Sequence, residues 1–184
     1  MSFAGESPAR LFFAALPDAT ARDRTAAAAR ALSLEPEARR VREENYHVTL
    51  AFVGEIPASQ VALLLDAGRA LCEAKFNLQF DAYEYWPTAE VVVAAAGAVP
   101  AALERLWQDL HRELARHQWA LEPKRLRPHV TLARKVSQAP VLQAMSAFDW
   151  PVSEFSLMRS DSGGAQPAYT VVGTWSLLDS AAET

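Results

Sequence analysis

The sequence predicts an α+β fold built from two similar lobes. Strand-like and helix-like segments follow one another in the order β-α-β-α-β-β-α-β-α-β-β, and the adjacent strand pairs are typical of antiparallel hairpins. The tetrapeptide HVTL also occurs twice, at residues 47–50 and 129–132, and in each half it is followed by a helix and then by two strands. We therefore expect a single domain over residues 1–184, to which each half contributes one HVTL strand.

The first half of the chain alternates short apolar strands with helices rich in alanine and leucine. We expect, in order, a strand over 10–17, a helix over 18–34, a charged connector over 35–45, a strand over 46–54 and a helix over 57–74. Pro17 stops the first strand, and Asp18 or Thr20 is placed to cap the helix that follows. Gly54 ends the second strand, and Pro57 opens the second helix.

The second half predicts a hairpin, a long helix, the second HVTL strand and a last strand pair. We expect strands over 76–86 and 90–97, a helix over 100–118, a strand over 127–135, a short helix over 139–148 and final strands over 152–160 and 168–178. The long helix has the clearest pattern, because its leucines and Trp107 recur at helical spacing.

Composition is that of an ordinary soluble globular protein, with 51% hydrophobic and 22% charged residues. There is no apolar run long enough to cross a bilayer, and the first residues lack the basic segment of a signal peptide. The single cysteine, Cys72, excludes an internal disulfide framework and suits a reducing compartment. We expect a cytoplasmic monomer that does not bind membranes.

The charge distribution is more informative than the net charge. A net charge of −4 argues against a broad, non-specific grip on nucleic acid. Basic residues nevertheless surround both HVTL copies: Arg39, Arg40, Arg42, Lys124, Arg125, Arg127, Arg134 and Lys135. The sequence therefore predicts a local anion site in an acidic protein.

Each HVTL copy places an imidazole and a hydroxyl on the same face of a strand. His47 and Thr49 alternate with aliphatic residues, as do His129 and Thr131, so the aliphatic side chains face the core. One such pair suits a solvated strand face, but two copies with flanking arginines favour a shared site. The remaining histidines, His111 and His117, lie on a charged helix face, where we expect a solvated surface role.

Two facing imidazoles can divide acid and base chemistry at neutral pH, because the unperturbed pKa of histidine is about 6.5. Threonine hydroxyls and guanidinium groups can hold a phosphate oxygen while water attacks. Metal chemistry fits poorly, since the motifs offer two histidines with no third nitrogen, sulfur or carboxylate at ligand spacing. The pattern therefore predicts phosphodiester cleavage with no metal and no cofactor.

The repeated H-x-T resembles the motif pair of the two-histidine phosphoesterase superfamily. The resemblance extends over RLFFAALP, REENYHVTLAFVGEI, LWQDLHRELARH, RPHVTLAR, FSLMRSDS and AYTVVGTWSL. Nearly the whole chain is similar to the bacterial family of RNA 2′,3′-cyclic phosphodiesterases, also called 2′–5′ RNA ligases. This resemblance implies a bilobal two-histidine phosphoesterase fold with both motif strands lining a central cleft. It also implies hydrolysis of RNA 2′,3′-cyclic phosphate to a 2′-phosphomonoester.

The resemblance assigns roles to five residues. His47 would protonate the leaving O3′, His129 would activate water, and Thr49 and Thr131 would bind the phosphate. Arg134 matches a phosphate-binding arginine of the family. Strict alternation from the second histidine turns this arginine to the opposite face, so a bulge or the end of the strand has to redirect it.

Two further residues are candidates for binding the rest of the substrate. Arg127 lies on the His129 face by alternation, although it precedes Pro128 and equally suits a loop. Aromatic residues commonly stack on the bases of single-stranded RNA, and of Phe12, Tyr46, Trp86, Tyr169 and Trp175 we single out Tyr169. Two alternatives stay open: joining of RNA through a 2′–5′ linkage in the same site, and a non-catalytic module that binds RNA or nucleotide phosphates.

Overall fold

The computed structural model describes residues 9–119, 121, 125–161 and 167–179, and it confirms the α+β fold class. Its helices are α1 (Ala19–Ala31), α2 (Val61–Arg69) and α3 (Ala101–Arg116), with 3-10 turns η1 (Glu43–Asn45), η2 (Ala58–Gln60) and η3 (Pro87–Ala89). Its strands are β1 (Ala9–Ala15), β2 (Arg39–Arg40), β3 (Val48–Ile56), β4 (Phe76–Trp86), β5 (Val91–Ala96), β6 (His129–Arg134), β7 (Phe148–Val152), β8 (Glu154–Asp161) and β9 (Ala168–Ser176).

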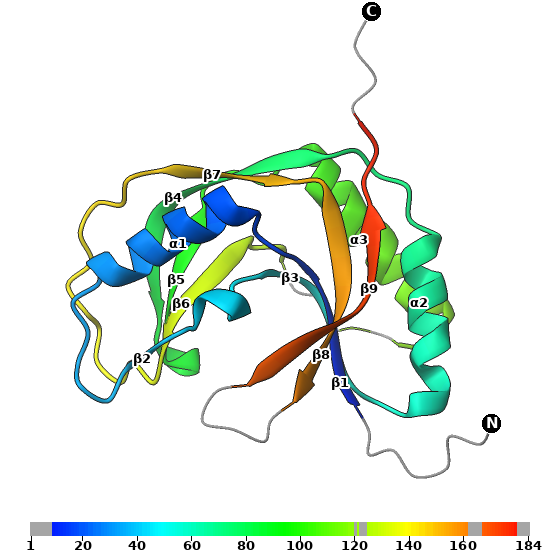
Figure 1. Cartoon of the computed structure of the whole chain (residues 1–184), viewed down its shortest axis with the longest axis horizontal. Helices are drawn as coiled ribbons and strands as arrows, with labels where there is room; N and C mark the ends of the chain where they lie inside the picture. Colours follow the sequence, from blue (N-terminus) through cyan, green and yellow to red (C-terminus); the bar gives the residue numbers. More distant parts are fainter. Residues whose placement is uncertain (1–8, 120, 122–124, 162–166, 180–184) are drawn as a thin grey trace, which may run out of the picture.

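One curled antiparallel sheet organises these elements (Figure 1). The strand order is β7-β4-β5-β6-β3-β1-β8-β9, and the short strand β2 pairs with the end of β6. The two HVTL strands, β3 and β6, are neighbours in the middle, with further strands on either side. Only Val48 and Val130 are paired between them. The expected division into two pseudo-symmetric lobes stays a prediction with which this strand order agrees.

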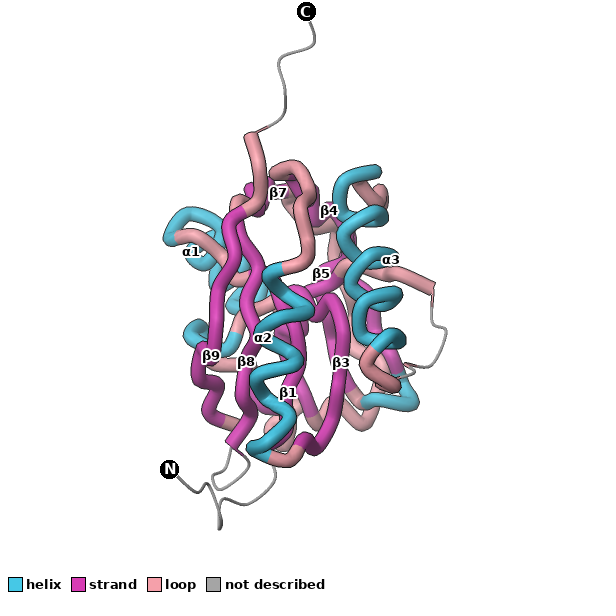
Figure 2. The backbone as a smooth tube through the Cα atoms, turned by 90° about the vertical axis from the view of Figure 1, so that its right-hand side faces the viewer, coloured by secondary structure: helices cyan, strands magenta, loops and turns pink. Residues whose placement is uncertain are grey.

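The helices cover the sheet in two groups (Figures 1 and 2). Helix α1 contacts β6 and β7, whereas α2 and α3 pack on each other and contact β8, β9 and β3. The helix that follows β1 therefore covers the half of the sheet to which β1 does not belong. This crossing ties the two halves of the chain together around β3 and β6.

Local sequence signals explain two of the helices. Asp18 is the N-cap of α1, and its Oδ1 accepts a hydrogen bond from the amide of Ala21 at 2.7 Å. In α3 one face buries four leucines completely: Leu103, Leu106, Leu110 and Leu114. Among the residues described, no helix is long and apolar enough to cross a membrane.

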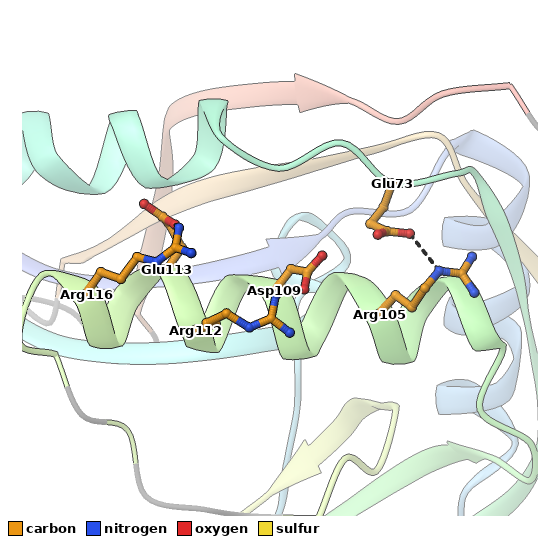
Figure 3. Close-up of polar contacts among 6 residues, drawn as sticks. All are labelled: Glu73, Arg105, Asp109, Arg112, Glu113 and Arg116. Atoms are coloured by element: carbon orange, nitrogen blue, oxygen red, sulfur yellow. Dashed lines mark hydrogen bonds and ion pairs between the residues drawn. The ribbon is translucent and has the colours of Figure 1, made fainter.

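The outer face of α3 is lined with ion pairs (Figure 3). Arg112 contacts Asp109 and Arg116 contacts Glu113 within the helix, while Arg105 reaches Glu73 in the segment after α2, at 3.1 Å. Most of the charge on this helix is thus neutralised locally.

The predicted helix over 139–148 is wrong. Residues 139–147 form an irregular segment in which Val141 is 86% exposed. A helix of fewer than three turns gains too little from hydrogen bonding to offset its nucleation cost, so it forms only where one face can be buried. Residues Phe148–Val152 instead form the edge strand β7. The sequence did not indicate this strand, because Pro151 is unusual within strands.

Two other expectations need smaller corrections. The charged connector over 35–45 contains the two-residue strand β2 and the turn η1. The helix expected over 57–74 begins with the turn η2 and ends at Arg69 as α2, after which Ala74 bridges Leu178.

Candidate active site

The pairing of β3 with β6 brings the two HVTL copies together. Because Val48 lies opposite Val130 in antiparallel register, His47 is placed opposite Thr131, and Thr49 opposite His129. Two cavities show the same arrangement: His47 and Thr131 line one of about 70 Å³, and Thr49 and His129 line one of about 700 Å³. Each imidazole is therefore beside the hydroxyl of the other copy.

Both imidazoles are oriented by the same hydrogen bond. Nδ1 of His47 lies 2.7 Å from the carbonyl oxygen of Asn45, and Nδ1 of His129 lies 2.7 Å from that of Arg127. A carbonyl oxygen only accepts, so each Nδ1 carries the proton and donates it. On each neutral ring this leaves Nε2 as the unprotonated nitrogen.

His47 lies among aromatic rings. Its ring centroid is 5.0 Å from that of Phe12 and 5.2 Å from that of Tyr169. Burial in this apolar setting lowers the pKa of His47 from 6.5 to about 4. The hydrogen bond to Asn45 opposes that shift, while the charges of Arg134 and His129 add to it.

His129 has a more polar setting. The ring of Trp86 is 4.4 Å away, and burial again lowers the pKa of His129, with a further lowering from Arg127 and Arg134. The bond to the Arg127 carbonyl and the carboxylate of Glu84 oppose this shift. Both histidines of the free protein thus favour the neutral form at pH 7, and a bound phosphate anion would raise both pKa values.

The two motif strands also share a bulge. Thr49 and Ala51 pair with neighbouring residues of β1, and Thr131 and Ala133 with neighbouring residues of β5, so one leucine in each copy is unpaired in the ladder. These bulged residues are Leu50 and Leu132. The identity of the two copies in fact covers five residues, HVTLA, and the bulge has the same place in both.

The bulge turns the sixth residue of each copy toward the cleft. In both strands the leucine and the alanine are buried in succession, and the next residue, Phe52 or Arg134, is exposed. Phe52 lines the larger cavity, and Arg134 lines the smaller one with His47 and Thr131. A bulge of the kind required for Arg134 to reach the site is therefore present.

The carbonyl groups of the bulged leucines have different donors. The amide of Val41 donates to the Leu132 carbonyl at 2.9 Å, whereas Nε2 of His111 donates to the Leu50 carbonyl at 3.3 Å. The prediction that His111 is a solvated surface residue is wrong: it lines the larger cavity, and burial lowers its pKa. His117, by contrast, keeps 29% of its side chain exposed and lies 3.7 Å from Glu113.

The other predicted residues lie at the edges of these cavities. Arg127 lines the larger cavity, contacts Glu84 at 2.5 Å and places its guanidinium 4.9 Å from the Trp86 ring. Tyr169 lines the smaller cavity and meets His47 edge-on. Lys124, one of the basic residues near the second motif, lies outside the described residues.

Sequence reasoning missed three contributors to the cleft: Phe52, Trp107 and His111. The repeat is identical over five residues, HVTLA, so Phe52 and Arg134 both occupy the sixth position. This equivalence was the sequence signal for Phe52. The ring of Trp107 lies 4.1 Å from His111, and both face the larger cavity from α3. No sequence pattern indicated these two, because their role depends on how α3 packs against β3.

Comparison with known proteins identifies the family of this chain. A family model described as the 2′–5′ RNA ligase superfamily matches residues 16–164. The chain belongs to this superfamily. Its relatives include the RNA 2′,3′-cyclic phosphodiesterase of Escherichia coli K12, which is 34% identical over 92% of this chain and 97% of that protein. The protein of the same name from Thermus thermophilus is 32% identical over 71% of each chain.

Solved structures of the superfamily share the fold. A phosphoesterase crystal structure superposes with a TM-score of 0.83 at 33% identity, covering 92% of this chain and 98% of that one. Escherichia coli LigT complexed with NADP+ gives 0.82 at 30% identity over the same shares. The resemblance seen in the sequence is therefore confirmed, and the enzyme class predicted from it is the one that these relatives carry in their names.

Proposed function

We propose that this protein hydrolyses RNA 2′,3′-cyclic phosphate ends to 2′-phosphomonoesters with two histidines and without a metal ion. The observation that carries the proposal is the interleaving of the two motifs. Each imidazole donates its Nδ1 proton to a backbone carbonyl. Each also lies beside the threonine of the other copy, His47 beside Thr131 and His129 beside Thr49. One phosphate between them would meet two exchangeable Nε2 positions and two hydroxyl groups.

The roles follow the superfamily resemblance. His129 takes a proton from water through Nε2, and the water oxygen forms a bond to phosphorus as the bond to O3′ breaks. His47 gives its Nε2 proton to O3′, so the product carries the phosphate on O2′. Thr49, Thr131 and Arg134 hold the non-bridging oxygens as negative charge builds up.

The proposed general acid, His47, needs the substrate to raise its pKa. His47 has a pKa of about 4 in the free protein, so it is rarely protonated at pH 7. A cyclic phosphate carries one negative charge, and placing it beside His47 favours the imidazolium, because opposite charges stabilise each other in a partly buried site. Substrate binding therefore helps to load the general acid.

Planar side chains that can stack on a base lie at both cavities, on either side of the proposed phosphate position. Tyr169 stands at the smaller cavity, and Phe52, Trp86 and Arg127 at the larger one. Stacking on such side chains holds bases without reading their sequence. We infer that RNA ends of varied sequence are accepted.

A second candidate is 2′–5′ joining in the same site. The larger cavity, on the His129 side, measures about 700 Å³, which is far more than an attacking water needs. An RNA hydroxyl placed there would replace water as the nucleophile with the same acid and base. We also propose a cytoplasmic location, which the single cysteine supports, and two lobes, which the strand order supports.

The deciding experiment is incubation with adenosine 2′,3′-cyclic phosphate in chelator, followed by identification of the product. Adenosine 2′-phosphate is expected. Adenosine 3′-phosphate would contradict the assignment of the leaving oxygen, and tight binding without turnover would favour a non-catalytic phosphate-binding module. Measuring RNA joining in parallel, with 5′-hydroxyl and cyclic phosphate ends, shows which nucleophile is preferred.

A further inference from the structure

Three cations line the smaller cavity together: Arg39, Arg134 and Lys135. Arg39 in β2 pairs directly with Arg134 in β6, so their Cα atoms are about 5 Å apart, and Lys135 follows Arg134 in the chain. All of these residues are exposed at the mouth of the cavity. Lys135 has a φ of 57°, a left-handed conformation that non-glycine residues rarely adopt.

No carboxylate within the described residues pairs with these three cations. Nη1 of Arg39 donates to the carbonyls of Pro36 and Ala38, which leaves Nη2 and Nε for another partner. The side chains of Arg134 and Lys135 make no hydrogen bond or ion pair in the part of the chain that the structure describes. The arginines of α3 contrast with them, since each of the three in Figure 3 has a carboxylate partner.

Such a cluster exceeds what the reacting phosphate needs. A cyclic phosphate diester carries one negative charge, and Arg134 already faces it beside His47 and Thr131. Two more cations held close together repel each other unless an anion lies between them. In an RNA end the next anion is the phosphate on the 5′ side of the terminal nucleotide.

We propose that Arg39 and Lys135 form a second phosphate subsite, which binds the phosphate on the 5′ side of the nucleotide that bears the reacting group. This inference rests on the proposed function, and it makes the preferred substrate the end of an RNA chain rather than a cyclic mononucleoside. Contacts to phosphate oxygens carry no sequence information, so this subsite would tolerate any base.

The test measures affinity for products, so it does not depend on turnover. Three ligands are titrated by calorimetry: adenosine 2′-phosphate, adenosine 2′,5′-bisphosphate and the dinucleotide ApA with a terminal 2′-phosphate. We expect the second and third ligands to bind roughly three- to tenfold tighter than the first, because exposed charged contacts contribute modestly. This preference should shrink as salt rises, since each added phosphate contact releases counterions.

Variants then locate the preference. Arg39→Gln and Lys135→Gln should each reduce the preference for a second phosphate, and the double variant should abolish it. Arg112→Gln, on the outer face of α3, is the matched control and should bind all three ligands as the unmodified protein does.

Three outcomes would overturn the inference. The first is an equal affinity for the ligands with one and two phosphates. The second is an equal loss for all three ligands in Arg39→Gln, which would place this arginine on the reacting phosphate. The third is a gain for the bisphosphate alone, which would assign the subsite to a terminal monoester instead of an RNA chain. Failure of the cyclic phosphodiesterase assay would appear separately, as absence of turnover with these affinities unchanged.

Discussion

The two HVTLA segments have the same backbone and different neighbours. Each orients its imidazole through the carbonyl two residues earlier, and each has a bulge at its leucine. The surroundings differ: His47 has aromatic rings and three exposed cations beside a cavity of about 70 Å³, whereas His129 has Trp86 and Glu84 beside one of about 700 Å³. A repeated sequence thus repeats geometry, and the neighbours differentiate the chemistry.

The largest expected effect tests whether both histidines are needed for activity. We expect His47→Ala and His129→Ala each to lower kcat by about 10²–10⁴-fold, because each removes one proton-transfer group. The double variant should lose little more than either single variant, since the two histidines act as a unit. Single-turnover rates with the cyclic phosphate measure this. His117→Ala, at the C-cap of α3, is the control, and substantial activity in either single variant would exclude the two-histidine mechanism.

The sixth position of each copy, Phe52 or Arg134, tests whether the two cavities serve different purposes. Arg134→Ala should lower kcat/KM by about 10–100-fold, the cost of one charged hydrogen bond to the reacting phosphate. Phe52→Ala should instead act mainly through KM and by a few fold, because stacking holds the substrate equally before and during reaction. Steady-state kinetics of both variants give the comparison. Equal effects on kcat would show that the two positions do the same work.

The bulge carbonyls offer a third test. His111→Leu leaves the Leu50 carbonyl without its donor and should lower the free energy of unfolding by about 1–3 kcal/mol. It should also reduce kcat a few fold, because Thr49 and His47 lie on the same strand segment. His111→Gln can restore the donor. Denaturant unfolding and kcat are measured together, and recovery of both in His111→Gln would identify His111 as a positioning residue, whereas recovery of neither would refute that role.

The sequence predicted much of this site because the information was local. Alternation placed His129 and Thr131 on one face, and the basic flanks predicted an anion site. The need for a bulge at Arg134 also followed from alternation, but its position required the ladder with β5, which is a tertiary contact. His111 was missed for the same reason: its charged helix face suggested solvent, and only the packing of α3 on β3 brings it to the Leu50 carbonyl. The edge strand β7 was missed because Pro151 contradicts a strand pattern.

The smallest expected effect concerns the one carboxylate that distinguishes the His129 side. Glu84 raises the pKa of His129, so Glu84→Gln should lower this pKa while keeping an acceptor for the indole N–H of Trp86. The proposed mechanism needs the two histidines of the free enzyme to hold one proton between them. The acid limb of kcat/KM reports the binding of a second proton and follows the lower pKa, that of His47, so it lies near pH 4.

The alkaline limb of kcat/KM reports loss of that shared proton and therefore follows the pKa of His129, which lies below 6.5. We expect kcat/KM to be highest at acidic pH and Glu84→Gln to move only the alkaline limb, toward lower pH and by less than about one unit. Glu73→Gln, which removes the carboxylate partner of Arg105 on α3, should leave the profile unchanged. A shift of the acid limb alone would mean that Glu84 acts on His47, and the electrostatic difference between the two half-sites would then have another origin.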